Sequence, residues 1–407
     1  MISDTLYSET ANYLEPVIML GRSDLKLEGL IYIADLLDRF TFSEYRVLRD
    51  LYEEGFDVKL LIYGPRAVAE LALTEFRPKI PTYWSPELGA LKHRYLSKSA
   101  LTFWKDNKLK HIIYPPLPEP EELIRLVEKS GYSLRTGPRK ILKLGGLSTV
   151  VDVAYDTRTK LILVLLEGPA RLVGLDSISE NIVLTVKLDL CSPSRLYLYN
   201  GTVYVLDRLS AEVVLVSLDE ARVISRLALT PPCLCLARSE QSYLPELVYG
   251  SVFEFRTSDG DELCGTGRFG NRDGKAKSAQ LSFPMDCSVD GINLFFIDTL
   301  NYSIRRINLV TGELRTILRY RIALRDLLCT RLILKDSEAI LLAKSKHKII
   351  KADLKTKEIE DLRSELRGIT LISRIGQLDR FVASDGVRIY MMELEGDELK
   401  VFKTFQV

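Results

Sequence analysis

A repeat with a period of 43 to 45 residues runs through the second part of this 407-residue chain. The intervals between its markers are 43, 89 and 45 residues, and the longest interval spans two periods. A repeat of this length is one supersecondary unit that cannot bury its apolar face alone, so several units must stack against one another. The markers are dipeptides at the ends of predicted strands: Leu175-Asp176, Leu218-Asp219, Ile307-Asn308 and Ala352-Asp353.

A second strand of the repeat keeps the same spacing. The segment 203–207 (Val-Tyr-Val-Leu-Asp) matches 294–298 (Leu-Phe-Phe-Ile-Asp) 91 positions later. The segments 339–343 and 381–385 continue the series. A period of about 40 to 45 residues with about four strands is typical of a β-propeller, in which each four-stranded blade packs only on its neighbours. We predict six blades, near residues 147–187, 188–228, 229–266, 267–318, 319–362 and 363–407.

The fourth predicted blade resembles the consensus of NHL-repeat propellers. The matching residues are Gly265-Thr266-Gly267-Arg268-Phe269-Gly270-Asn271-Arg272-Asp273-Gly274, Phe283-Pro284, Phe296-Ile297-Asp298-Thr299-Leu300-Asn301, Ile304-Arg305-Arg306-Ile307 and Thr311-Gly312. The other blades are degenerate: Asp207 and Asp385 keep the aspartate, whereas blade five has Ala343. The resemblance implies a six-bladed propeller whose loops bind a partner, since NHL domains serve in protein contacts, RNA binding and, in a minority, lyase or hydrolase chemistry.

The first part of the chain has a different pattern. Residues 30–34 and 58–63 have the apolar runs of buried strands, with helical periodicity over 43–54 between them. Further helices are predicted over 65–76, 85–95 and 119–129, and a hairpin over 101–113. This order resembles the thioredoxin-like fold of the AhpC/TSA and TlpA type, from about Leu25 to Gly131. The segments Ile80 to Leu91 and Pro115 to Leu123 are similar to the family's entries into its central and final helices.

The predicted thioredoxin-like domain lacks the family's redox site. The family places its cysteine at the start of the first helix, here about residues 38–44, but the first cysteine of this chain is Cys191. The cis-proline of the family would fall near Ser99-Ala100, where there is no proline. Thiol chemistry needs a thiolate, so we predict a redox-inactive interaction module.

The predicted fold class is therefore multidomain, with an α/β thioredoxin-like N-terminal domain and an all-β six-bladed propeller. The predicted divisions are an N-terminal extension over 1–24, the thioredoxin-like domain over 25–132, a linker over 133–140 and the NHL-like β-propeller over 141–407.

Charge and composition limit the kinds of partner and the location that we expect for this protein. Lysine and arginine number 56 against 55 for aspartate and glutamate, a net charge of +1. This balance gives no global field toward nucleic acid or an anionic membrane, so charge effects must be local. No membrane span or targeting segment is evident, and we predict a cytoplasmic protein. Glutamine is rare beside Glu, Lys and Arg, which favours a thermophile.

The cysteines and histidines do not form a recognisable site. All six cysteines lie between positions 191 and 329, and none belongs to a CxxC pair. We interpret them as buried free thiols of a reducing compartment, with a metal site or a disulfide as the alternative. The histidines His93, His111 and His347 have no acidic or cysteine partner at ligand spacing. No cofactor and no metal are predicted.

A basic cluster follows the fourth blade and is the first candidate binding site. Arginine forks and aromatic faces bind phosphates and nucleobases. A solvated face, or an ion-pair network suited to high temperature, is the alternative interpretation. The residues of this candidate site are Arg305, Arg306, Arg319, Arg321, Arg325 and Tyr320.

A set of aspartates is the second candidate site. Converging acids at the mouth of a propeller channel can hold a cation or a polar ligand. Alternatively, these aspartates fix turns and hydrogen bonds between strands. The candidates at the channel mouth are Asp207, Asp298 and Asp385, and Asp152 and Asp286 belong to the same wider set.

We predict a non-enzymatic recognition or scaffold protein that binds a protein partner through the propeller loops. The first alternative is a propeller enzyme of the lyase or hydrolase type, with a ligand or metal at the channel mouth. The second alternative is an RNA-binding propeller that uses the basic cluster. None of the GxSxG, HExxH or Walker motifs is present in the sequence, so nucleophilic, zinc-protease and P-loop mechanisms have no support.

Overall fold

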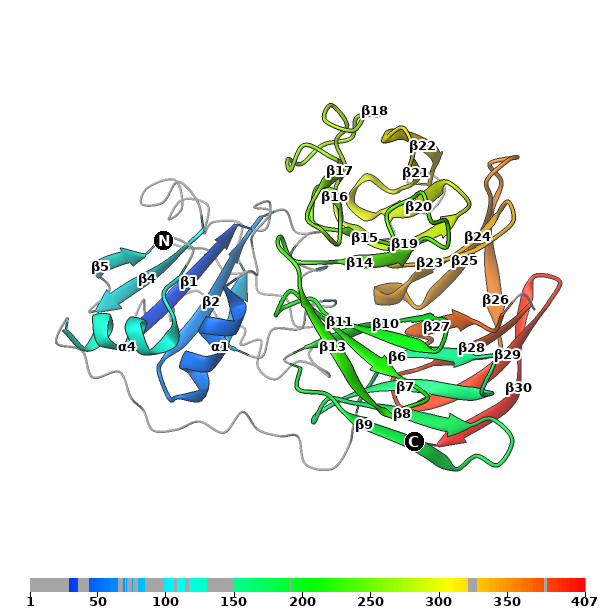
Figure 1. Cartoon of the computed structure of the whole chain (residues 1–407), viewed down its shortest axis with the longest axis horizontal. Helices are drawn as coiled ribbons and strands as arrows, with labels where there is room; N and C mark the ends of the chain where they lie inside the picture. The colour runs from blue at the N-terminus through cyan, green and yellow to red at the C-terminus, as the bar shows by residue number, and fades with distance from the viewer. Residues whose placement is uncertain are drawn as a thin grey trace. The chain divides into compact units, whose positions relative to one another are not determined.

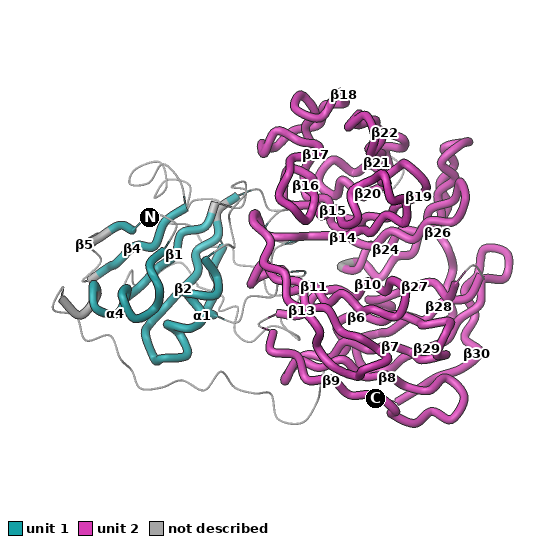
Figure 2. Tube along the Cα trace, viewed as in Figure 1, with its two compact units in different colours: residues 1–145 teal, residues 146–407 magenta. Residues whose placement is uncertain are grey.

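The computed structural model divides the chain into two compact units, residues 1–145 and 146–407 (Figure 2). Each unit has its own sheets and its own apolar core. The residues that the structure describes are 29–35, 44–64, 69, 71, 75, 80–84, 99–105, 108–113, 117–129, 149–190, 192–320, 328–376 and 379–406.

The first unit contains one five-stranded sheet in the order β3-β2-β1-β4-β5. Strands β1 to β3 are parallel, and β4 and β5 are antiparallel to their neighbours. The apolar face of α1 turns Tyr45, Leu48 and Leu51 inward at three-residue spacing. The elements are β1 (Gly29–Asp35), α1 (Tyr45–Glu53), β2 (Val58–Tyr63), β3 (Thr82–Trp84), β4 (Ala100–Lys105), β5 (Lys108–Ile113) and α4 (Pro120–Lys129).

The predicted fold class, with its α/β thioredoxin-like domain, is wrong. The described residues are nearly all β: they form thirty strands, and their two α-helices, α1 and α4, hold 9 and 10 residues. The helices predicted over 65–76 and 85–95, and the segment near 38–44 where the redox cysteine would stand, fall largely or wholly outside the described residues. Helical periodicity identifies an amphipathic segment, but many different folds contain such segments. The order of predicted helices and strands was therefore not enough to establish a thioredoxin-like domain.

The second unit is a succession of six antiparallel sheets, each of which contains four consecutive strands (Figure 1). The first three sheets are β6 (Thr149–Asp156), β7 (Leu161–Glu167), β8 (Arg171–Asp176) and β9 (Ile182–Lys187); β10 (Pro193–Tyr199), β11 (Thr202–Asp207), β12 (Glu212–Ser217) and β13 (Arg222–Ala228); and β14 (Cys235–Arg238), β15 (Leu247–Gly250), β16 (Phe255–Thr257) and β17 (Glu262–Cys264). The last three are β19 (Pro284–Asp290), β20 (Asn293–Asp298), β21 (Ser303–Asn308) and β22 (Glu313–Arg319); β23 (Arg331–Lys335), β24 (Glu338–Ala343), β25 (Lys348–Asp353) and β26 (Ile359–Ser364); and β27 (Leu371–Arg374), β28 (Arg380–Ser384), β29 (Arg388–Glu395) and β30 (Glu398–Gln406).

The six sheets form a closed ring. Their first strands contact one another in the cyclic order β6, β10, β14, β19, β23, β27 and back to β6. The amide of Val150 donates to the carbonyl of Gly386 at 3.1 Å, which joins the first sheet to the last. At the periphery β26 pairs with β30 in parallel, and the short β18 (Gly274–Lys275) adds to the outer edge of β22. This all-β arrangement is propeller-like, as the repeat predicts at this coarse level.

The core of the ring consists of one apolar cluster between each pair of neighbouring sheets. Alternate residues of one strand serve two clusters: Val203 and Val205 of β11 face the first sheet, whereas Tyr204 and Leu206 face the third. A strand that is buried on both faces reads as a nearly continuous apolar run, which explains the apolar strands of the sequence repeat. Among the described residues no helix is long and apolar enough to cross a membrane.

Candidate functional site

The first strands of the sheets begin at an ion-paired network on the axis of the ring. Arg331, the first residue of β23, donates from Nη1 to Oδ2 of Asp152 in β6 at 3.0 Å. Its Nε donates to the carbonyl of Ile372 in β27 at 3.1 Å and lies 3.7 Å from Oδ2 of Asp286 in β19. Asp286 also accepts the amide of Leu332 at 2.9 Å. One arginine thus joins four of the six sheets.

Two further arginines complete this network. Arg208 is fully buried and donates to the carbonyls of Leu234 at 3.0 Å and Met285 at 3.1 Å. Arg195 is also buried and donates to the carbonyl of Thr330. The charged groups at this end of the axis are therefore bound to one another and to the backbone, which fixes the sheets relative to one another. We call this set the axial network: Asp152, Arg195, Arg208, Asp286 and Arg331.

The structure does not bring the predicted channel-mouth acids together, because each lies at the end of the second strand of a different sheet. Asp207 accepts the amides of Ser192 at 2.8 Å and Ser210 at 3.0 Å. Asp385 accepts the hydroxyl of Tyr390 at 2.7 Å. Burial raises the pKa of Asp385, but its hydrogen bonds outweigh that effect and leave the pKa below 3.8. These contacts are those of aspartates that fix turns and strand ends.

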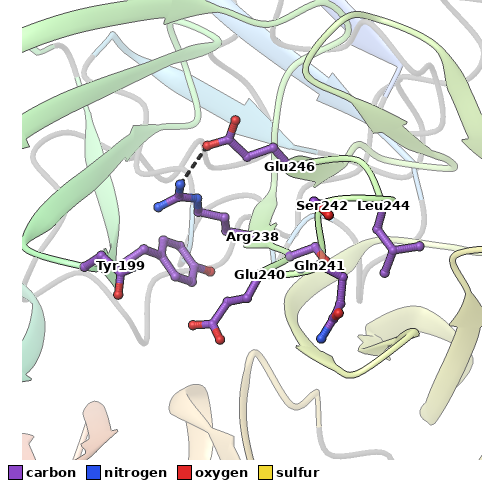
Figure 3. A pocket seen from close by; sticks show the side chains of 9 residues that line it. Tyr199, Arg238, Glu240, Gln241, Ser242, Leu244 and Glu246 are labelled. Carbon is purple, nitrogen blue, oxygen red and sulfur yellow. Dashed lines mark hydrogen bonds and ion pairs between the residues drawn. The ribbon is translucent and has the colours of Figure 1, made fainter.

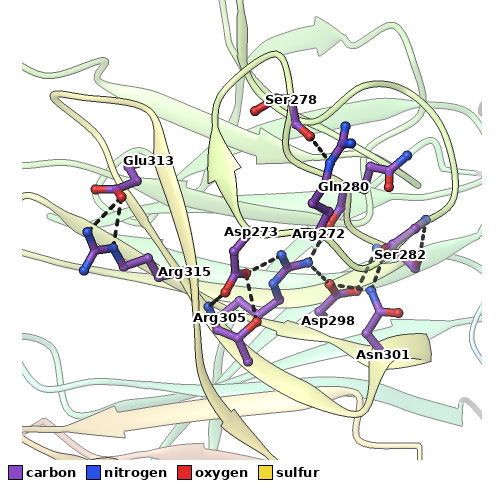
Figure 4. A network of polar contacts seen from close by, with 12 residues as sticks. Arg272, Asp273, Ser278, Gln280, Ser282, Asp298, Asn301, Arg305, Glu313 and Arg315 are labelled. Carbon is purple, nitrogen blue, oxygen red and sulfur yellow. Dashed lines mark hydrogen bonds and ion pairs between the residues drawn. The ribbon is translucent and has the colours of Figure 1, made fainter.

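Asp298, the third of these acids, belongs to a buried ion-pair network (Figure 4). Arg305 has no exposed side-chain surface and donates from Nη1 to Asp298 at 2.6 Å and from Nη2 to Asp273 at 2.8 Å. Asp298 also accepts the amide of Ser282 at 2.7 Å and the side-chain amide of Asn301 at 2.8 Å. Burial raises the pKa of Asp298 to about 6, against the opposing effect of Arg305.

This second network attaches the long segment between β17 and β19 to the fourth sheet. Arg305 donates to the carbonyl of Gln280 at 2.6 Å, and Asn301 donates to the carbonyl of Gly270 at 2.8 Å. Asp273 accepts both the amide and the hydroxyl of Thr316, at 2.9 Å each. The contacts of Asp298 and Arg305 therefore hold parts of the fold together.

The predicted basic cluster separates into buried and exposed residues. Arg305 and Tyr320 are fully buried, so neither side chain is on the surface where a partner binds. Arg306 on β21 is partly exposed and Arg319 at the end of β22 is exposed, and their predicted binding role stays a prediction. The remaining two arginines of the cluster lie outside the described residues: Arg321 and Arg325.

An open pocket lies at the opposite end of the ring, between the second and third sheets (Figure 3). Its volume is about 600 Å³, within the range of ligand pockets. One wall is Tyr199 and Asn200, where β10 turns into β11, and the other is Arg238 with the loop 239–246, where β14 turns into β15. A backbone hydrogen bond joins the two ends of this loop, since the amide of Ser239 donates to the carbonyl of Glu246 at 2.9 Å.

The polar groups of the pocket differ in whether they are already paired. Arg238 donates to Glu246 at 2.8 Å, so its charge is matched. Glu240 is exposed and forms no ion pair or hydrogen bond with any described residue. Burial raises the pKa of Tyr199 well above 10, so its phenol is neutral at physiological pH, and its ring meets that of Tyr204 edge-on at 5.5 Å. The lining therefore carries one excess negative charge.

This pocket was not predicted from the sequence, although the sequence contains a signal for it. The first turn of the second sheet has two residues, Asn200 and Gly201, whereas the corresponding loop of the third sheet has eight, residues 239–246. A loop that is much longer than its equivalents in a repeat marks an insertion on one face, and such insertions are often binding elements.

The thiols that the structure describes are buried: Cys233, Cys235, Cys264, Cys287 and Cys329. The described cysteines are free, and burial raises the pKa of Cys264 and Cys329 to about 12. They are protonated and poorly nucleophilic at neutral pH. Within the ranges that the structure describes, no three His, Cys, Asp or Glu residues are grouped so that they could hold a metal ion.

Comparison with known proteins establishes no family. No protein-family model matches the sequence, and no curated protein matches it. Among solved structures, the chain is similar to PorZ, a surface component of the type-IX secretion system of Porphyromonas gingivalis, at 12% identity and a TM-score of 0.41 over 75% of this chain and 36% of that one. The chain thus corresponds to about a third of PorZ. A nidogen–laminin complex has 12% identity and a TM-score of 0.40, with 65% and 88% of the two chains covered. The structure of U3-55K has 8% identity and a TM-score of 0.43, with 65% and 83% covered. These likenesses show neither a thioredoxin-like nor an NHL domain.

Proposed function

We propose that this chain is a recognition or scaffold protein, in which a six-bladed, NHL-like propeller binds a protein partner through its loops. The observation that carries the proposal is the open pocket formed by the eight-residue loop 239–246 and the turn at Tyr199 and Asn200. Its polar lining is accessible, whereas the acids and arginines of the axial network are used inside the fold. A polar, solvated recess beside an exposed aromatic residue, Tyr243, which is 67% exposed, is typical of a recognition surface.

The alternative functions receive less support from the described residues. A propeller enzyme would need converging acids, but Asp207, Asp298 and Asp385 are each engaged in separate turns or ion pairs. RNA binding would use exposed cations, of which Arg306 and Arg319 are the described members of the predicted cluster. We also propose a cytoplasmic location, which suits buried cysteines with free thiols.

The test compares partners captured by the wild-type chain and by two variants. In the first variant, residues 239–246 are replaced by Asn-Gly, the turn that the second sheet uses at positions 200 and 201. In the control variant, Val310 and Ile292, exposed at turns of the fourth sheet, are replaced by Ser. We expect at least one protein from the native organism to be recovered about ten-fold less on the loop variant and unchanged on the control. Equal recovery of every protein on all three baits would contradict the proposal.

A further inference from the structure

The turns around the pocket are strongly acidic, although the whole chain has a net charge of only +1. The first strands begin together at the axial network, so they end together at the other end of the ring, where each sheet's first and third turns lie. These turns contain eleven acidic and four basic residues. Six of the acids form ion pairs with arginine or lysine: Glu180, Asp219, Glu220, Glu246, Asp379 and Asp397. We call them the acidic end. An excess of one sign on one end of a nearly neutral protein attracts and orients a partner of the opposite charge.

Within the acidic end, Glu240 is placed in a recess as well as being unpaired. The other unpaired acids of these turns include Asp259, Asp261 and Asp336, which line no described pocket. Glu240 shares its recess with Tyr199 and with the side chain of Gln241 (Figure 3). The recess thus contains an unpaired carboxylate between two walls, the turn at Tyr199 and the loop 239–246.

The lining of the pocket is rich in hydrogen-bond acceptors. The side chains of Asn200, Glu240 and Gln241 supply amide or carboxylate oxygens, and Ser242 supplies a hydroxyl. The one cation of the lining, Arg238, is already matched by Glu246 at 2.8 Å. A ligand that offers several N–H donors and one positive charge complements this set, whereas a phosphate or a carboxylate would meet the unpaired Glu240.

We propose that the pocket receives a basic side chain, arginine or lysine, that projects from the protein partner. This inference rests on the proposed function, since it names the group of the partner that the pocket recognises. The guanidinium of arginine carries five N–H donors and the ammonium of lysine carries three. A volume of about 600 Å³ leaves room for such a side chain and for the waters that commonly bridge polar interfaces.

The test uses small probes and the whole 407-residue chain. N-acetyl-arginine methylamide and N-acetyl-lysine methylamide are titrated against the isotope-labelled protein, and the backbone amides of residues 239–246 are followed by NMR. The neutral probe is N-acetyl-glutamine methylamide. We expect at least one basic probe to shift these amides with a dissociation constant at least five-fold below that of the neutral probe, and expect added salt to weaken the binding.

Two variants separate the pocket from the general field. Glu240→Gln should weaken the binding of the basic probe at least five-fold, because it removes the unpaired charge and keeps the shape. Asp336→Asn removes the same charge from another turn of the acidic end and should change the binding less than two-fold. Equal binding of basic and neutral probes, or equal effects of the two variants, would overturn the inference. A partner that is lost on the loop-shortened chain but binds the Glu240→Gln chain normally would overturn it too, while the proposed function would stand.

Discussion

Arg331 and Asp152 are 179 positions apart in the sequence, yet their side chains meet at 3.0 Å on the axis of the ring. The contact joins the fifth sheet to the first, and both side chains are buried. Asp152 would be an uncompensated charge without Arg331, because a buried ion depends on its partner to offset the loss of water. The pair therefore links two strands that are distant in the sequence, and we expect the stability of the ring to depend on it.

Removal of one member of this pair should destabilise the ring strongly. Arg331→Met should lower the free energy of unfolding by about 3–5 kcal/mol, because Asp152 stays buried without its partner. The double variant Arg331→Met with Asp152→Asn should recover part of the loss, since the orphaned charge is gone. Chemical denaturation of the wild type, Arg331→Met, Asp152→Asn and the double variant measures both effects. A double variant that is as unstable as the sum of two single variants would show that the pair is not coupled.

The pH dependence of stability should report on Asp298. The ordinary pKa of an aspartate carboxyl is 3.8, and the pKa of Asp298 in the folded protein is about 6. Because the folded pKa is raised, folding favours the protonated form, whose stabilising contribution is complete below about pH 4 and is lost as the pH rises through 6. The free energy of unfolding of the wild type should fall relative to Asp298→Asn by up to about 3 kcal/mol between pH 4 and 7.

The matched control for this titration is Asp385→Asn. The pKa of Asp385 is lowered in the folded protein, so its contribution is present above pH 4 and is lost as the pH falls. The stability difference between wild type and this variant should therefore change in the opposite direction. Parallel pH profiles for Asp298→Asn and Asp385→Asn would contradict the assignment of the raised pKa to Asp298.

The repeat of strands was predictable from the sequence, because strands buried on both faces leave apolar runs that end at turn residues. The run 203–207 and the run 294–298 became β11 and β20 at equivalent places of two sheets. The N-terminal fold class was predicted wrongly, because the helical period of a segment such as 43–54 says which face is buried but not what covers it. A local sequence pattern therefore predicts the fold only where the repeated segment is itself a unit of the structure, as each four-stranded sheet of the second unit is.

The site residues were less predictable, since burial and pairing of charges depend on contacts between distant parts of the chain. Arg305 and Arg306 are adjacent in the sequence and were assigned to one basic cluster, but they point to opposite faces of β21 because side chains alternate along a strand. Asp273, which binds Arg305, is 32 positions away. Composition shows that acids and bases are balanced, and only the fold shows which of them meet.

Phe296 should be a strong determinant of stability. Its side chain is fully buried between the third and fourth sheets, with its ring 4.8 Å from that of Phe255. Phe296→Ala should lower the free energy of unfolding by about 3–5 kcal/mol, because it removes apolar contacts and leaves a cavity. The control is Val310→Ala at a site that is 62% exposed, which should change stability by less than about 0.5 kcal/mol. A loss below about 1 kcal/mol for Phe296→Ala would contradict the packing described for this ring.

The neighbouring arginines of β21 provide the sharpest comparison, because the two substitutions are chemically identical. Arg305→Ala should lower the free energy of unfolding by about 3–5 kcal/mol at pH 7, since it leaves the buried Asp298 without its cation. Arg306→Ala should change it by less than about 1 kcal/mol, because that side chain is partly exposed and makes no ion pair with a described residue. The loss in Arg305→Ala should also shrink below pH 6, where Asp298 becomes protonated and no longer needs the charge of Arg305. Unfolding measured at pH 5 and pH 7 checks both statements, and equal losses for the two variants at pH 7 would show that the strand register described here is wrong.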